Sequence, residues 1–293
     1  MINSKEEIIT VRFLSEYLHF KIFEKQELNR LLKEKFSQAY DESENETIVG
    51  ADHEITTDID QERNLISMNP LLNDKMREQL NRNLELIKKF YVPQKFKEPV
   101  LKNKIESISQ YFDSIFEYDE FQKLIDYVNN NINIDSFELY KKTILEFEEC
   151  VKEERNIIIS NSKASEVSKD AAAKIMKCFS DTFKSSNILE ALFSRLRNND
   201  KNADIYEKLL MYLNKFFSSI GIYTPMDVVF GDKYDPDVQK DYSVVSVHTS
   251  NTKMQSMIME IERLPYSIDY YFRNTTKTRC VVGNISVLSA NQC

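Results

Sequence analysis

The side chains that most often carry catalysis are few and scattered in this sequence. Its three histidines, His19, His53 and His248, do not stand at metal-ligand spacing from one another, so the usual zinc and iron sites are not predicted. His248 has serines nearby, but a Ser/His hydrolase also needs a G-x-S-x-G nucleophile elbow, which the sequence lacks. Cys150 and Cys280 have no histidine close in sequence to activate a thiol. This pattern indicates a protein that is not an enzyme, with a divergent active site as the open alternative.

Loops that bind phosphate groups are also missing. The chain has only four glycines, Gly50, Gly221, Gly231 and Gly283, where average usage of about 7% would supply roughly 20. Neither G-x-x-x-x-G-K-S/T nor G-x-G-x-x-G occurs. We therefore expect no cofactor, no metal and no catalytic residue, and the composition favours a function based on binding.

Negative charge is concentrated in one stretch. Residues 41–62 hold nine acidic residues and no lysine or arginine, so the net charge of −8 leaves +1 for the rest of the chain. A nucleic-acid-binding domain would show a strong basic excess, and we expect no nucleic-acid partner. The stretch is interpreted as a flexible charged linker. Its D-H-E and D-x-D-x-E runs leave a cation site as the alternative, although the EF-hand pattern is absent.

The cysteines and the start of the chain predict a cytoplasmic protein. Cys150, Cys178, Cys280 and Cys293 fall at irregular intervals without a C-x-x-C pair, which is not the pattern of a disulfide scaffold. The first residues are rich in glutamate where a signal peptide would be apolar. No run of 18 apolar residues occurs, so no membrane-spanning helix is predicted.

Long helices are predicted for most of the chain. No glycine occurs between residues 51 and 220, as expected where helices fill the sequence, because glycine is unfavourable inside a helix. Apolar residues recur at helical spacing between capping, proline and asparagine signals. The predicted helical stretches lie at about 4–40, 70–91, 100–128, 136–151, 165–197 and 203–219.

One of these helices carries a seam that resembles a coiled coil. Asp135 is predicted to cap it, with Glu138 three residues later. Its apolar residues alternate three and four apart over two heptads, at Phe137, Tyr140, Ile144, Phe147 and Val151. Such a seam needs a partner helix, either within the chain or in a second copy. We expect an elongated homodimer, with an intramolecular helix pair as the alternative.

After Gly221 the apolar period changes from helical spacing to two, which predicts strands. The predicted fold class is α+β, with long helices followed by a small antiparallel β domain. The predicted divisions are an N-terminal helical segment, the acidic linker, a helical region, a helix pair and the β domain, at 1–40, 41–62, 63–160, 161–220 and 221–293.

This order of elements resembles that of the GrpE-type nucleotide exchange factors, which act on DnaK-type chaperones. A helix pair, a glycine and a compact β domain follow one another in that family, and the likeness covers about residues 165–293. Gly221-Ile222 resembles the family's G-V, and the run from Gly231 to Pro236, with Tyr234 and Asp235, resembles its G-x-x-F-D-P.

The resemblance implies that the β domain binds the nucleotide-binding domain of a DnaK-type chaperone and promotes nucleotide release. Arg273, Lys277 and Arg279 surround a polar loop between two predicted strands and, with Pro236, would contact the partner. A solvated surface is the alternative for these basic residues. Gly221, Gly231, Tyr234 and Asp235 would form the structural signature of the domain. The alternative function is a helical scaffold whose β domain docks a partner without releasing nucleotide.

Overall fold

The computed structural model describes residues 63–94, 99–198, 200–225, 233–237 and 240–290. The predicted N-terminal helix, the acidic stretch 41–62 and Gly231 lie outside these residues.

The described part of the chain is α+β, as predicted. Residues 63–68 are helical. The longer helices are α4 (Asp74–Phe90), α5 (Ile105–Ser114), α6 (Asp119–Asn130), α7 (Phe137–Asn161), α8 (Val167–Phe179), α9 (Ile188–Arg197) and α10 (Ala203–Ser219). The π-helical turn η2 (Ser180–Lys184) follows α8, and the 3-10 turn η3 (Thr252–Met254) precedes β3. The strands are β1 (Ile222–Tyr223), β2 (Tyr242–His248), β3 (Ile258–Arg263), β4 (Tyr266–Phe272), β5 (Thr275–Val281) and β6 (Gly283–Ser289).

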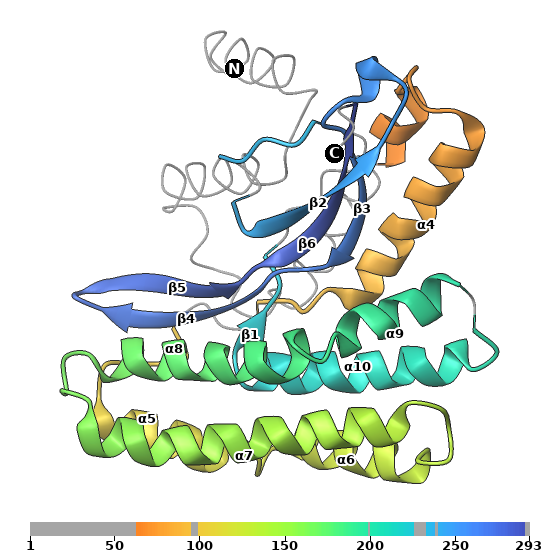
Figure 1. Cartoon of the computed structure of the whole chain (residues 1–293). Helices are drawn as coiled ribbons and strands as arrows, with labels where there is room; N and C mark the ends of the chain where they lie inside the picture. The colour runs from red at the N-terminus through yellow and green to blue at the C-terminus, as the bar shows by residue number, and fades with distance from the viewer. Residues whose placement is uncertain (1–62, 95–98, 199, 226–232, 238–239, 291–293) are drawn as a thin grey trace, which may run out of the picture.

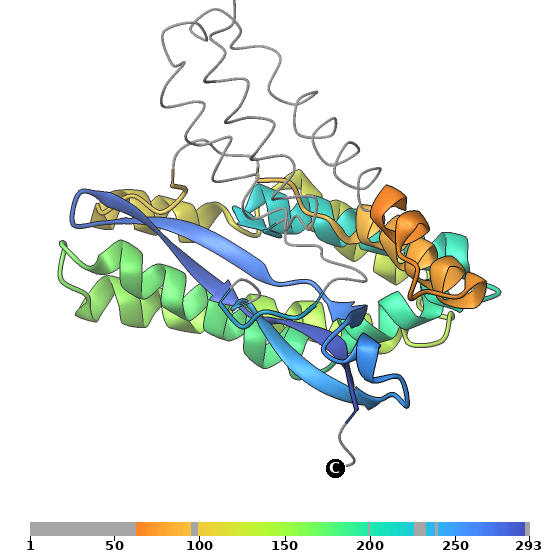
Figure 2. The same cartoon turned by 90° about the horizontal axis from the view of Figure 1, so that it is seen from above.

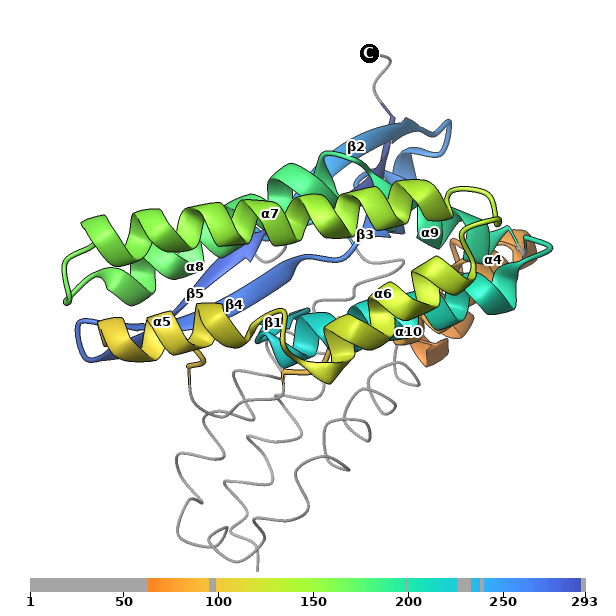
Figure 3. The ribbon, with the colours of Figure 1, turned by 90° about the horizontal axis from the view of Figure 1, so that it is seen from below.

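The elements form three layers. The strands lie over α8, α9 and α10, and those helices lie over α5, α6 and α7 (Figure 1). Seen from above, the β4 and β5 ribbon runs along the helices and ends in a free tip (Figure 2). Seen from below, α5, α6 and α7 form the outer helical layer (Figure 3). The middle helical layer is therefore covered on both sides, which fits its high apolar content.

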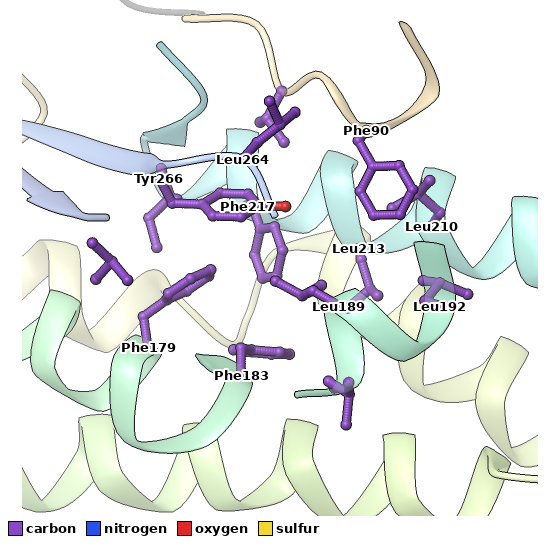
Figure 4. Packing of buried hydrophobic residues seen from close by; sticks show 14 of the residues in the cluster. Phe90, Phe179, Phe183, Leu189, Leu192, Leu210, Leu213, Phe217, Leu264 and Tyr266 are labelled. Carbon is purple, nitrogen blue, oxygen red and sulfur yellow. The ribbon is translucent and has the colours of Figure 1, made fainter. Parts of the chain in front are cut away.

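The hydrophobic core is continuous from the helices into the strands. Tyr266 of β4 is fully buried, and its ring lies 4.9 Å from Phe179 of α8 and 5.8 Å from Phe217 of α10 (Figure 4). Phe179 and Phe217 are themselves 5.2 Å apart, edge to face, an arrangement that aromatic rings favour. The buried residues form one cluster that crosses residue 221, so the predicted boundary there does not divide the core.

The seam of α7 is buried within one chain. All five seam residues are at most 1% exposed, and α7 packs against α5, α6, α8 and η2. The seam therefore packs within one chain, as the alternative interpretation predicted. Because its residues are buried there, the seam cannot contact a second copy. The helix begins at Phe137, with Ser136 rather than Asp135 at its N-cap. The prediction of an Asp135 cap is wrong because Arg195 donates to that carboxylate at 2.7 Å instead.

The predicted single helix over 165–197 is interrupted. α8 passes into η2, and Asn187 then adopts a left-handed conformation with φ 54° before α9 starts. The serine, threonine, aspartate and asparagine residues between Ser180 and Asn187 favour this break because these residue types are weak helix formers. The wider π turn keeps Phe179 and Phe183 both fully buried, with ring centroids 5.2 Å apart. The interruption thus serves packing.

Within the described residues, the strands form two three-stranded sheets rather than the predicted antiparallel domain. One has the order β1-β4-β5 and is antiparallel. The other has the order β2-β6-β3, and β2 pairs with β6 in parallel, from Tyr242 opposite Gly283 to His248 opposite Ser289. The antiparallel prediction is therefore wrong for this pair, because strands far apart in sequence can pair in either direction.

Cys150 of α7 and Cys178 of α8 form a disulfide, with their Cα atoms 5.8 Å apart. The irregular spacing of the cysteines did not predict this pair, which forms because the close packing of α7 on α8 brings the two side chains together. This pairing removes the cysteine argument for a cytoplasmic protein, and a cytoplasmic location stays a prediction. None of the described helices is both long and apolar enough to cross a membrane.

Candidate functional site

The β4–β5 hairpin presents the predicted basic residues at the edge of a sheet. Its strands pair from Tyr266 opposite Val281 to Phe272 opposite Thr275. The two turn residues, Arg273 and Asn274, have φ 49° and 60°. A two-residue turn with positive φ at both positions matches the twist of the strands that it joins. Because β5 is the outer strand of its sheet, the hairpin turns a strand edge towards solvent.

Lys277 and Arg279 lie on the face of this sheet that is turned towards α8. They stand opposite Tyr270 and Ile268, and alternation along β4 places both of these residues on the face of Tyr266, which packs on Phe179 of α8. The first five residues of β5 are nevertheless exposed. The two cations therefore follow the rim between the sheet and the helix.

A lysine of α8 joins them through an aromatic ring. The Nζ atom of Lys169 lies 5.3 Å from the ring centroid of Phe272, and the guanidinium carbon of Arg273 lies 5.0 Å from the same centroid. Both distances are within the range of a cation–π interaction. We call Lys169, Arg273, Lys277 and Arg279 the basic edge.

The charges of the basic edge are not neutralised within the described residues. There, Arg273, Lys277 and Arg279 form no ion pair, and Lys169 has only Glu166 at 3.9 Å. The carboxylate of Asp269 is engaged elsewhere, because it accepts hydrogen bonds from Tyr223 at 2.9 Å, Thr278 at 2.8 Å and Gln94 at 2.7 Å. Burial, reinforced by Asp269, raises the pKa of the Tyr223 hydroxyl. That hydroxyl therefore stays protonated and donates to Asp269, so it adds no negative charge to the surroundings of the basic edge.

The hairpin is held in place by contacts on its backbone. The amide of Tyr271 donates to the carbonyl of Leu101 at 2.9 Å. The hydroxyl of Ser168 contacts the carbonyl of Tyr271 and lies 3.2 Å from the side-chain oxygen of Asn103. Asn103 in turn donates to the carbonyl of Ser165 at 2.8 Å. The strand, the start of α8 and the segment before α5 are thus tied together, so the basic edge is preorganised.

Pro236 does not belong to this site. The amide of Tyr234 donates to the carbonyl of Ser256 at 2.6 Å, and the amide of Ser256 donates to the carbonyl of Leu288 at 2.7 Å, which places the turn beside the β2-β6-β3 sheet. The carboxylate of Asp235 accepts from the amide of Asp237 at 2.9 Å, an Asx turn. Pro236 is exposed and Tyr234 is half-buried, so the structure separates these residues from the basic edge.

Gly221 has a conformational role at the end of α10. Its φ is +77°, and an added Cβ would overlap the Val100 side chain. We expect Gly221→Ala to lower the free energy of unfolding by about 2 kcal/mol, because the left-handed conformation is unfavourable for alanine and the overlap forces Val100 to move. Urea denaturation measures this loss. In the double variant with Val100→Ala, only the steric part should be recovered. A Gly221→Ala variant as stable as the wild type would contradict this assignment.

A concave surface, separate from the basic edge, lies between α4, α6 and α10. This groove of about 800 Å³ is lined by residues that include Lys89, Glu120, Glu207 and Lys215. Lys89 and Glu207 form an ion pair at 2.6 Å across it. Its lining holds three lysines and three carboxylates, so the groove offers less unbalanced charge to a ligand than the basic edge. No group of three or more potential metal ligands occurs among the described residues.

No family model, no curated protein and no solved structure matches this chain. The resemblance to GrpE-type factors therefore rests on its motif residues, and the site is judged by its own geometry. Sequence reasoning found Arg273, Lys277 and Arg279 but missed Lys169 and Phe272. Ser168 is the neighbour of Lys169, and it contacts Tyr271, which lies 103 residues further along the chain. A local sequence pattern cannot predict a contact over that separation.

Proposed function

We propose that this protein is a non-catalytic interaction module that docks an acidic surface of a partner protein on its basic edge. The main supporting observation is a row of exposed cations along a strand edge, with no neutralising carboxylate among the residues that the structure describes. Charged groups placed in this way speed encounter with a complementary surface and fix the orientation of the complex. The outer edge of β5 would also allow an extended acidic segment to add as a further strand. Lys277 and Arg279, two residues apart, then meet alternate side chains of that segment.

A more specific candidate is nucleotide exchange on a DnaK-type chaperone. It is supported by the order α10, Gly221, β1 and by the Tyr234-Asp235-Pro236 turn, both of which resemble the GrpE-type factors. An exchange factor acts by binding the open form of its partner more tightly than the closed form. In this proposal the basic edge contacts the nucleotide-binding domain and performs no chemical step.

Charge reversal on β5 tests the docking proposal. The probe is a fluorescein-labelled peptide of alternating glutamate and serine, and its fluorescence anisotropy is followed with the full chain at low salt. We expect Lys277→Glu with Arg279→Glu to weaken binding at least about tenfold, which corresponds to about 1.4 kcal/mol. Added salt should weaken wild-type binding, because exposed charges are screened.

The matched control is Lys75→Glu with Lys88→Glu on α4. These lysines are exposed and the change in net charge is identical, so binding should change less than about twofold if position matters rather than total charge. Equal losses in the two double variants would contradict a defined site. Equally tight binding of a single-stranded oligonucleotide would contradict an acidic protein surface as the ligand.

Stopped-flow release of a labelled adenine nucleotide from a DnaK-type chaperone tests the specific candidate. We expect release to be faster with the wild type than with the β5 double variant. If release is unchanged while the acidic peptide still binds, nucleotide exchange is rejected and the docking module stands.

A further inference from the structure

Strand β2 lacks cover on both of its faces. Only Tyr242 at its start is buried, and residues 243–248 are exposed. Val244, Val245 and Val247 are 38%, 44% and 43% exposed. The strand pairs with β6 along one edge, and no described strand pairs with the other edge. β2 is thus held by one ladder of hydrogen bonds and by little apolar burial.

The edge of β2 that faces away from β6, which no described strand pairs with, also lacks the usual protection against association. Edge strands of monomeric proteins commonly carry charged residues, proline or a bulge that prevents pairing with another chain. The stretch Tyr-Ser-Val-Val-Ser-Val-His has no acidic residue, lysine, arginine or proline, and its register with β6 is unbroken. The edge strand of the other sheet, β5, carries Lys277 and Arg279. The edge strand β5 therefore carries positive charges that oppose pairing with an identical strand, and the edge strand β2 carries none.

We propose that β2 pairs antiparallel with β2 of a second copy of this chain, around a twofold axis at Ser246. An isologous contact sets identical strands against each other, and β2 suits this because it brings no like charges together. An acidic partner would find no cation on it. The two sheets would join into one sheet of order β3-β6-β2-β2-β6-β3.

The register at Ser246 is the one that brings most valine together. Val245 then lies opposite Val247 of the second copy, and Val247 lies opposite Val245, so four valines meet on one face. A register centred on Val245 would instead set Val244 and Val247 opposite serines. Cross-strand pairs of β-branched residues stabilise a sheet. Because the strand contact is small compared with stable interfaces, we expect a dimer that dissociates on dilution.

Substitutions at Ser246 test this pairing without disturbing the core. Its side chain is exposed and makes no hydrogen bond among the described residues. Ser246→Lys places two lysines opposite each other across the axis, and we expect the dimer dissociation constant to rise at least about tenfold. Ser246→Thr should leave it within about threefold, because threonine is neutral and favours strands. Sedimentation velocity over a range of concentrations measures both, with circular dichroism as the check on folding.

Oxidation of cysteine variants tests the register. In Ser246→Cys the two new cysteines face each other with Cα atoms about 4.5–5.5 Å apart, within the range of a disulfide. In the control His248→Cys the two cysteines would be four residues apart along the strands, about 13 Å. We expect a covalent dimer from Ser246→Cys only. A wild type that stays monomeric at about 100 μM, where a weak interface should be populated, equal cross-linking of both variants, or no effect of Ser246→Lys would overturn the proposal.

Discussion

Replacing Arg263 by methionine is expected to lower the free energy of unfolding by about 3–5 kcal/mol, because it leaves a buried carboxylate without its partner. The Arg263 side chain of β3 is 6% exposed and pairs with Glu190 of α9. It also donates to the carbonyl of Val282 at 3.1 Å. This arginine therefore joins the helical layer to the second sheet.

The double variant Glu190→Leu with Arg263→Met separates the charge effect from packing. Replacing both members of a buried pair by apolar residues is often close to neutral, so most of the loss should be recovered. Urea denaturation of the wild type, the single variants Glu190→Leu and Arg263→Met, and the double variant measures this. A double variant no more stable than Arg263→Met would show that packing, and not the uncompensated charge, carries the effect.

The pH dependence of Arg263→Met has a defined sign. Burial raises the pKa of Glu190 above its usual value of 4.5, although Arg263 opposes the shift. A raised folded pKa means that the folded protein binds this proton more tightly than the unfolded chain, so this group favours folding at low pH and loses that effect as pH rises. Without Arg263 the carboxylate is harder to ionise. The stability deficit of the variant should therefore be smaller near pH 5 than at pH 7.

Removing the disulfide is expected to lower the free energy of unfolding by about 3–4 kcal/mol under oxidising conditions, as the chain-entropy relation gives for such a loop. Cys150 and Cys178 are 28 residues apart. The bond holds α7 against α8, the helix that carries Lys169. Alanine at both positions removes the cross-link. Thermal and urea unfolding with and without dithiothreitol measure the effect.

Reductant supplies the control for the disulfide. Dithiothreitol should bring the wild type close to the double alanine variant and should leave that variant unchanged. Cys280 is half-buried and lies outside this disulfide, and it is unchanged in both proteins. A wild type whose stability does not respond to reductant would contradict a stabilising disulfide.

Local sequence patterns were enough to predict helices that bury a single apolar face. The alternation of three and four from Phe137 to Val151 predicted the first part of α7, because a single buried stripe decides a helix, but the helix continues to Asn161. The same reasoning extended one helix over 165–197, where the buried ring of Phe179 ends α8 and the buried ring of Phe183 lies within the π turn η2. Periodicity records which residues are buried, and it does not record a change of helical pitch between them.

Pairing between distant segments could not be predicted. Period two indicated strands at β2 and β6, but it carries no information on direction, so their parallel ladder was missed. Asp135 has the sequence of a helix cap, yet Arg195 donates a hydrogen bond to its carboxylate, and this lowers the pKa of Asp135. The predicted part of the basic edge came from one hairpin. Lys169 was missed because it reaches the hairpin only through tertiary packing on Phe272.

The position of β6 bears on how this protein is made. β6 is the last of the described strands along the chain and the middle strand of its sheet. While the ribosome is still synthesising residues 283–289, β2 and β3 have no common neighbour, and the helices can pack before this sheet can close. The nascent chain therefore passes through a stage in which the valines of β2 and the edges of both strands are open, and aggregation competes most strongly with folding at that stage.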